Sequence, residues 1–164
     1  MTCGWGVVVV GFGALACALR PLAAHAEDVA IVVNKANPTD QLSLSELVKI
    51  FKQEKQHWDY GEKIYLVMRE GGAVEKVIVL QKIYRMGDKD LKKFWLGKLF
   101  RGEIAELPNT LSSNEAVKRF IGAAPNAVGV IDATAMDDSV KALRIDGKLP
   151  GEASYFLSDS AASK

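Results

Sequence analysis

The residues best suited to chemistry lie where a predicted strand meets a predicted helix. Arg69 ends an apolar run, and Gly71, Gly72 and Ala73 follow it. A helix that begins after such a turn presents free backbone N–H groups, and its dipole favours an anion. A guanidinium is well shaped to bind an oxyanion through two hydrogen bonds. The sequence therefore predicts an oxyanion site at Arg69, Gly71, Gly72 and Ala73, with a plain Gly-Gly turn as the alternative.

Residues for catalysis are sparse. His57 is the only histidine after position 26, so a multi-histidine metal site and a histidine relay are both excluded. The sequence has no Gly-x-Ser-x-Gly turn, no P-loop and no Gly-x-Gly-x-x-Gly segment behind a strand. The carboxylate pairs Asp88-Asp90 and Asp137-Asp138 are explained by helix caps and solvated turns. We predict no enzymatic activity, no cofactor and no metal site.

The charge balance argues against nucleic acid as a partner. The chain has 164 residues, with 21 Lys and Arg against 20 Asp and Glu, so no charge excess attracts nucleic acid or anionic lipid. One cluster, Lys92-Lys93-Phe94-Trp95 with Lys98 and Arg101, mixes basic and aromatic residues as a nucleic-acid surface does. Helical spacing nevertheless places Leu91, Trp95 and Leu99 on one face and the lysines toward solvent, which favours an ordinary amphipathic helix.

Residues 1–26 predict a secretory signal peptide. The uncharged run 4–19 is shorter than the roughly 20 residues of a spanning helix, and Ala24 and Ala26 form an A-x-A cleavage site. The alternatives are an uncleaved membrane anchor and a lipid anchor at Cys17. Cleavage would remove both cysteines, Cys3 and Cys17, and with them any disulfide or thiolate site. We expect a periplasmic protein with no stable membrane span after cleavage.

Predicted strands and helices alternate through the rest of the chain. The continuous β-branched run Val29–Asn34 is typical of a strand buried on both faces. Ser43 with Glu46 forms a capping box for the next helix. Further strands are predicted at 64–68, 127–131 and 140–145, and helices at 74–84, from a cap at Asp88 to near Gly102, and from a capping box of Ser112 and Glu115 to Pro125.

These elements predict one α/β domain over residues 27–157 with a largely parallel or mixed sheet. Segment 74–84 is assigned to a helix by its length, although 77–80 alone could form a strand. Residues 158–164 are small and polar, and predict a flexible tail.

Several short motifs occur in a characteristic order over residues 29–157. They are Ile31-Val32-Val33-Asn34-Lys35-Ala36-Asn37-Pro38, Leu44-Ser45-Glu46-Leu47 with Ile50-Phe51, Trp58 with Gly61-Glu62-Lys63-Ile64, Phe94-Trp95 with Phe100-Arg101-Gly102, Pro125 to Ile131, and Asp146-Gly147 with Pro150 and Tyr155. In this order the chain resembles the substrate-binding proteins of bacterial phosphate ABC transporters, in particular their small, shortened members. The resemblance implies a shortened type II periplasmic-binding-protein-like domain with a mixed sheet flanked by helices.

The chain departs from this family at the phosphate loop. The family's loop reads Arg-x-x-x-Ser-Gly-Thr, so Arg69 matches the arginine while Ala73, Val74 and Glu75 occupy the Ser-Gly-Thr positions. Each hydrogen bond lost to a charged ligand costs about 1.5–3 kcal/mol, so two lost donors predict binding weaker by roughly two to four orders of magnitude. Glu75 would also repel a phosphate if it faces the loop. The family's N-terminal part, which carries its first anion-binding loop, has no counterpart here.

Two hypotheses of function follow. The first is an exported, non-enzymatic solute-binding-like protein that binds inorganic phosphate or another oxyanion weakly and serves ABC transporter membrane subunits or another envelope protein. The alternative is an envelope interaction module that kept the fold and lost the ligand. A contiguous apolar patch beside the Arg69 turn would favour the alternative.

Overall fold

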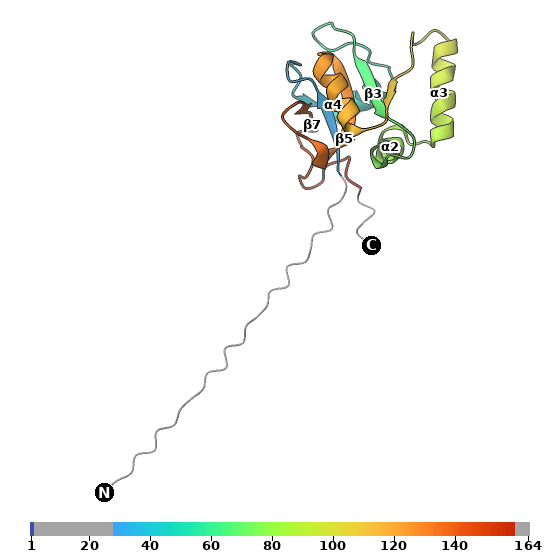
Figure 1. Cartoon of the computed structure of the whole chain (residues 1–164). Coiled ribbons are helices and arrows are strands. Elements are labelled where there is room, and N and C mark those ends of the chain that lie inside the picture. The colour runs from blue at the N-terminus through green and yellow to red at the C-terminus, as the bar shows by residue number, and fades with distance from the viewer. Residues whose placement is uncertain (2–27, 160–164) are drawn as a thin grey trace.

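The computed structural model describes residue 1 and residues 28–159, so all but the first residue of the predicted signal peptide and all but the start of the predicted tail lie outside the described residues (Figure 1). The strands are β1 (Val29–Val33), β2 (Gln41–Leu42), β3 (Tyr65–Arg69), β4 (Asn109–Leu111), β5 (Ala127–Asp132), β6 (Lys141–Ala142) and β7 (Arg144–Ile145). The helices are α1 (Leu44–Phe51), α2 (Val74–Val79), the π-helical turn η1 (Leu80–Tyr84), α3 (Asp88–Phe100), α4 (Asn114–Ala123) and the 3₁₀ turn η2 (Ala133–Ala135).

A five-stranded mixed sheet organises the domain, in the order β4-β3-β5-β1-β6. Strand β3 runs parallel to both β4 and β5, whereas β1 runs antiparallel to both β5 and β6. Strands β2 and β7 form a separate parallel pair. The predicted α/β domain with a mixed sheet flanked by helices is therefore confirmed.

Side chains of the sheet alternate between two hydrophobic clusters. Val29, Ile31 and Val33 of β1 lie in the larger cluster with residues of α1, α2, η1 and α3, whereas Ala30 and Val32 lie in the smaller cluster with Val117 and Ile121 of α4. Figure 1 shows α4 lying across the sheet and α3 standing beyond its β3–β4 side. Because helices cover both faces, a central strand such as β1 is apolar at every position.

Gly129 of β5 permits the close approach of α4 to the sheet. A Cβ atom placed on Gly129 would lie 2.9 Å from Cγ1 of Val117 and 3.2 Å from Cδ1 of Ile121. Both distances are shorter than the 3.5–4.0 Å at which carbon atoms pack favourably. The glycine of the Pro125–Ile131 motif thus has a packing role.

The N-cap residue predicted from sequence is confirmed for one helix and differs from the observed N-cap for two. The capping box of Ser43 and Glu46 is present at α1. At α4 the prediction of Ser112 was wrong, because the side chain of Ser113 accepts the backbone N–H of Ala116. At α3 the cap is Gly87, and Asp88 is the first helical residue. An acidic residue is favourable in the first helical turn as well as at the cap, so sequence alone did not separate the two positions.

Segment 74–84 is helical, as its length predicted, but it changes from α-helix to π-helix after Val79. The predicted strand 140–145 is two strands, because β6 pairs with β1 whereas β7 pairs with β2. Strands β2 and β4 were not predicted. Both are short and largely polar, so they carry no hydrophobic alternation.

Candidate functional site

Arg69 is the last residue of β3, and its side chain is held by two groups. Nη1 donates a hydrogen bond of 3.1 Å to the carbonyl oxygen of Leu111, at the end of the neighbouring strand β4. Nε lies 3.6 Å from Oε1 of Glu75 in the first turn of α2, and the two side chains are only 11% and 9% exposed. The guanidinium thus has a largely buried carboxylate beside it.

The ion pair between Arg69 and Glu75 leaves hydrogen-bonding capacity unused. A separation of 3.6 Å is longer than a hydrogen bond, and Nε is buried without a hydrogen-bond partner among the described residues. Glu75 therefore balances the charge of Arg69 without reproducing the bidentate contact that a guanidinium makes with an oxyanion. The sequence left open whether Glu75 faces the loop, and the structure places its carboxylate against Arg69.

The turn after Arg69 is exposed and closes on itself. Gly71 and Gly72 are exposed, and Gly72 has φ of +91°, a conformation that favours glycine. The N–H of Ala73 donates to the carbonyl of Glu70 at 3.4 Å, so this amide already has a partner. Gly71, Gly72 and Ala73 therefore follow Arg69 closely in the chain, as predicted. The side chain of Arg69, however, contacts Leu111 and Glu75.

Several motif residues of the sequence have structural partners. The Nδ2 group of Asn34 donates to the carbonyl oxygens of Ile121 and Gly122 at 2.9 and 2.8 Å, which satisfies the end of α4. The Nε1 group of Trp58 donates to the carbonyl oxygen of Asn126 at 3.0 Å. These residues tie the loops after β1 and α1 to the α4–β5 connection, so they support the fold.

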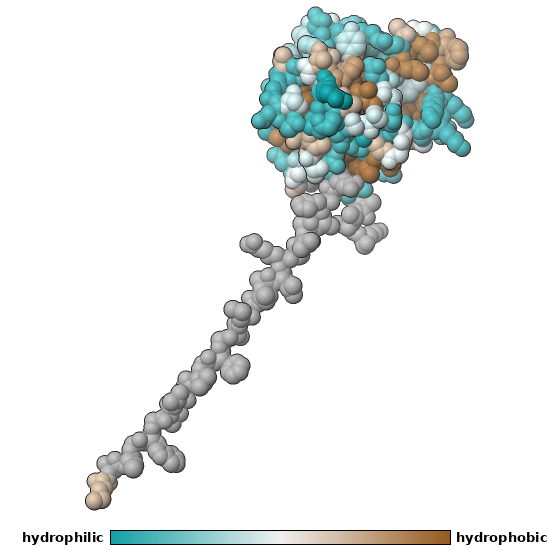
Figure 2. Space-filling model, in the orientation of Figure 1, coloured by the Kyte–Doolittle hydropathy of each residue, from teal (hydrophilic) through white to brown (hydrophobic). Residues whose placement is uncertain are grey.

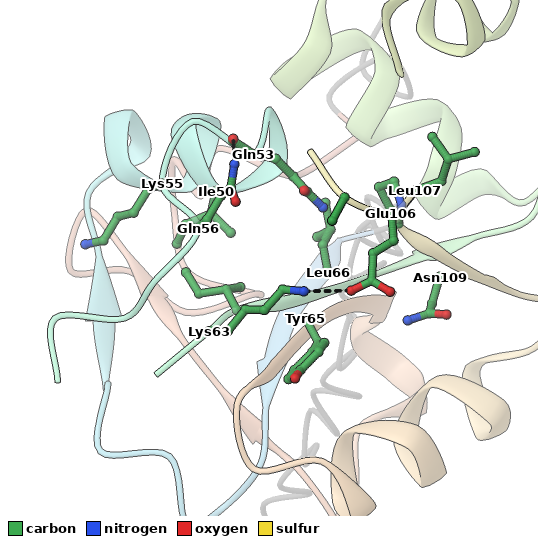
Figure 3. A pocket seen from close by; sticks show the side chains of 13 residues that line it. Ile50, Gln53, Lys55, Gln56, Lys63, Tyr65, Leu66, Glu106, Leu107 and Asn109 are labelled. Carbon is green, nitrogen blue, oxygen red and sulfur yellow. Dashed lines mark hydrogen bonds and ion pairs between the residues drawn. The ribbon is translucent and has the colours of Figure 1, made fainter. Parts of the chain in front are cut away.

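A small cavity lies between the loop after α1, the start of β3 and the loop that precedes β4 (Figure 3). Lys63 and Glu106 bridge it with an ion pair of 2.8 Å. Its volume of about 40 Å³ is enough for one or two waters. Neither Arg69 nor the turn lines it.

A larger cavity of about 290 Å³ lies beside Arg69, between the β3–β4 side of the sheet and α3. Its wall is largely apolar, and its residues are Met68, Arg69, Lys76, Asp88, Leu91, Lys92, Trp95, Leu96, Leu107, Pro108 and Thr110. We name this site the α3 cavity. The sequence did not predict this cavity, because the cavity forms beside β4, a strand that carries no hydrophobic pattern.

Lys98 contradicts the prediction that the lysines of α3 point to solvent. Its side chain is buried, with Nζ 3.6 Å from Glu103 and 5.3 Å from the ring centroid of Phe94.

Within residues 28–159 the structure contains no group of three or more His, Cys, Asp and Glu side chains arranged for a metal ion. Among the same residues, no helix is both long enough and apolar enough to cross a membrane.

Comparison with known proteins gives several structural relatives. No family model matches the chain. An ABC-type phosphate transport receptor from Vibrio cholerae aligns with a TM-score of 0.62 and 25% identity, over 76% of this chain and 48% of that protein. PstS from Borrelia burgdorferi gives 0.58 and 13%, over 76% and 49%. A phosphate-binding protein from Stenotrophomonas maltophilia gives 0.54 and 17%, over 78% and 41%.

The chain thus spans about half the length of the solved structures that it matches. The resemblance predicted from the motif order is confirmed: the chain has the fold of the phosphate ABC transporter substrate-binding proteins, over about half of their length.

Proposed function

We propose that the protein is an exported, non-enzymatic solute-binding-like component related to phosphate transport, in which Glu75 replaces the ligand as the anionic partner of Arg69. The related proteins are transport receptors and phosphate-binding proteins. Free phosphate is then bound only weakly, through Arg69 and the amides of Gly71 and Gly72, since the Ala73 amide is already hydrogen-bonded to Glu70. Such a component would act in the periplasm. Its partner there would be the membrane subunits of a transporter or another envelope protein.

The observation that carries this proposal is the ion pair between Arg69 and Glu75. A phosphate at Arg69 would meet the Glu75 carboxylate at the same guanidinium, and like charges in a poorly solvated site repel each other strongly. Glu75 also replaces a hydroxyl donor of the family's loop, so the same position both removes a hydrogen bond and adds a negative charge.

Calorimetric titration of the protein with phosphate, and with sulfate as the comparison anion, tests the proposal. We expect weak binding, with Kd of about 1 mM or above. Glu75→Gln removes the charge at nearly constant shape, and we expect it to strengthen phosphate binding by at least about tenfold, since a hydrogen bond to a charged group is worth about 1.5–3 kcal/mol. Arg69→Ala in the Glu75→Gln background should abolish the gain.

Glu70→Gln is the matched control, because Glu70 carries the same charge and lies next to Arg69 in the chain but is exposed. It should change phosphate affinity less than twofold, as expected for a screened surface charge. Micromolar phosphate binding by the unaltered protein would overturn the assignment to Glu75. If the Glu70 and Glu75 variants changed phosphate affinity equally, the change would reflect net charge and not a specific site at Arg69.

A second candidate function, the envelope interaction module, is favoured by an exposed apolar patch. Phe100 at the end of α3 is 86% exposed, and Leu96 and Leu107 are each 45% exposed beside the α3 cavity. Figure 2 shows hydrophobic residues gathered over the upper part of the region where Figure 1 places α3. Patches of this kind mark contact surfaces more often than isolated apolar residues do.

The simplest occupant of this patch is a second copy of the chain. Sedimentation velocity over a range of protein concentrations would then give a dimer that Phe100→Glu dissociates. A monomer at every concentration would exclude self-association through this patch.

A further inference from the structure

The α3 cavity combines an apolar wall with a small set of charged groups. Six of its lining residues are apolar: Met68, Leu91, Trp95, Leu96, Leu107 and Pro108. Its volume of about 290 Å³ lies at the lower end of the range of small-molecule sites. Sites of that kind are mostly apolar, with a few convergent polar groups that fix the orientation of the ligand.

The charges that line the cavity leave a positive excess. The lining contains the cations Arg69, Lys76 and Lys92 and one carboxylate, Asp88. Glu75, which does not line the cavity, balances the charge of Arg69. Asp88 is then shared by two lysines, with Oδ1 2.6 Å from Nζ of Lys76 and Oδ2 3.0 Å from Nζ of Lys92.

This arrangement selects the sign of a ligand charge. One carboxylate cannot neutralise two ammonium groups, so the cavity lining carries about one uncompensated positive charge. The ion pairs with Lys76 first and Lys92 second hold the pKa of Asp88 below its usual value, so this carboxylate is ionised at neutral pH. The side chain of Lys76 is only 12% exposed, which weakens solvent screening of its charge.

We propose that the α3 cavity binds a small amphipathic monoanion, with an apolar chain or ring against Leu91, Trp95 and Leu96 and a carboxylate at Lys76 and Lys92. Thr110 adds a hydroxyl at the wall. This ligand class differs from inorganic phosphate, which has no apolar part. The inference therefore goes beyond the proposed function and stands without it.

Calorimetric titration with octanoate tests the inference. Three further compounds separate the contributions of the apolar chain, the carboxylate and the Arg69 turn. Acetate keeps the carboxylate without the chain, octylamine keeps the chain with the opposite charge, and phosphate tests the Arg69 turn. We expect octanoate to bind with Kd below about 1 mM and acetate and octylamine to bind at least about tenfold more weakly. Octanoate should also change the fluorescence of Trp95, which lines the cavity.

Neighbouring residues of α3 supply matched controls. Lys92 lines the cavity and Lys93 does not, and their side chains are 72% and 81% exposed. Lys92→Gln should weaken octanoate about threefold, the usual contribution of an exposed charge pair, and Lys93→Gln should leave it unchanged. Leu96→Asp places a carboxylate in the wall and should weaken binding by at least about tenfold.

Two results would overturn the inference. One is octanoate affinity equal to that of acetate, because the apolar wall would then contribute nothing. The other is unchanged octanoate binding in Leu96→Asp, which would place the ligand elsewhere. A failure of phosphate binding alone bears only on the Arg69 turn, so the two proposals are separated by the compounds used.

Discussion

Replacement of Gly129 by alanine probes the closest contact between the sheet and a helix. The added Cβ atom would lie 2.9 Å from Cγ1 of Val117 and 3.2 Å from Cδ1 of Ile121. Val117, Ile121 and the neighbouring Val128 and Val130 of β5 are all at most 1% exposed, so no side chain can move into solvent to make room. Relief must come from a rotamer change or a shift of α4, both of which disturb a close-packed core.

The expected cost follows from this geometry. Inserting one carbon into a well-packed core costs typically 1–3 kcal/mol. In a domain of this size that corresponds to a fall in melting temperature of about 4–10 °C. Urea unfolding followed by far-UV circular dichroism would measure it, with the m value unchanged if only the stability has changed.

Gly122→Ala is the matched control, because Gly122 lies in α4 and nothing lies within 4 Å of an added Cβ atom there. Alanine is a better helix former, so this variant should be more stable by a few tenths to about 1 kcal/mol. The pair should therefore move in opposite directions. A Gly129→Ala protein as stable as the unaltered protein would refute the claim that glycine is required for the approach of α4.

Three further predictions concern hydrogen bonds of the described residues. Ser113→Ala should destabilise the protein by about 1 kcal/mol in urea unfolding and Ser112→Ala by much less, since only Ser113 caps α4; the reverse order would restore the cap predicted from sequence. Hydrogen bonds from the backbone N–H of Ser43, and next from its hydroxyl, lower the pKa of Glu46 below its ordinary value of 4.5. The ionised Glu46 therefore stabilises the folded protein above about pH 4.5, and this contribution is lost as the pH falls through the lower folded-state pKa. Glu46→Gln should flatten the acid side of the stability profile, and an unchanged profile would contradict this. Tyr84→Phe removes a buried bond of 2.6 Å to the last carbonyl of α1 and should cost about 1–3 kcal/mol in urea unfolding; no loss would mean that the carbonyl finds another donor.

Burial also raises the pKa of Tyr84 well above 10. Its phenol is therefore neutral in the folded protein, and ionisation on unfolding lowers stability as the pH rises above the ordinary tyrosine value. Absorbance titration should find this tyrosine ionising only when the protein unfolds. Ionisation near pH 10 in the folded state would show that the ring is accessible.

Local patterns were sufficient wherever the determining contacts lie close together in sequence. The β-branched run of β1 predicted burial on both faces, and all five of its residues are buried. The spacing of Ser43 and Glu46 predicted the capping box of α1. The order of the motifs along the chain predicted the fold, which the solved structures share over about half of their length.

Contacts between distant segments decided the rest. Strand β4 is a short polar segment that exists because it pairs with β3, about forty residues earlier in the chain. Lys98 is buried because α3 and the following loop bring Phe94 and Glu103 around it. The α3 cavity depends on the gap between that helix and the β3–β4 side of the sheet.

The oxyanion site shows the same division within one short segment. The sequence by itself determined that Arg69 directly follows a predicted strand, that a glycine turn comes next and that Glu75 stands where the related loop has a hydroxyl. Only the tertiary structure decided that the Arg69 side chain contacts Leu111 and Glu75. The physical reason is that residue spacing fixes backbone conformation locally, whereas the partner of a charged side chain depends on which segments pack around it and exclude water.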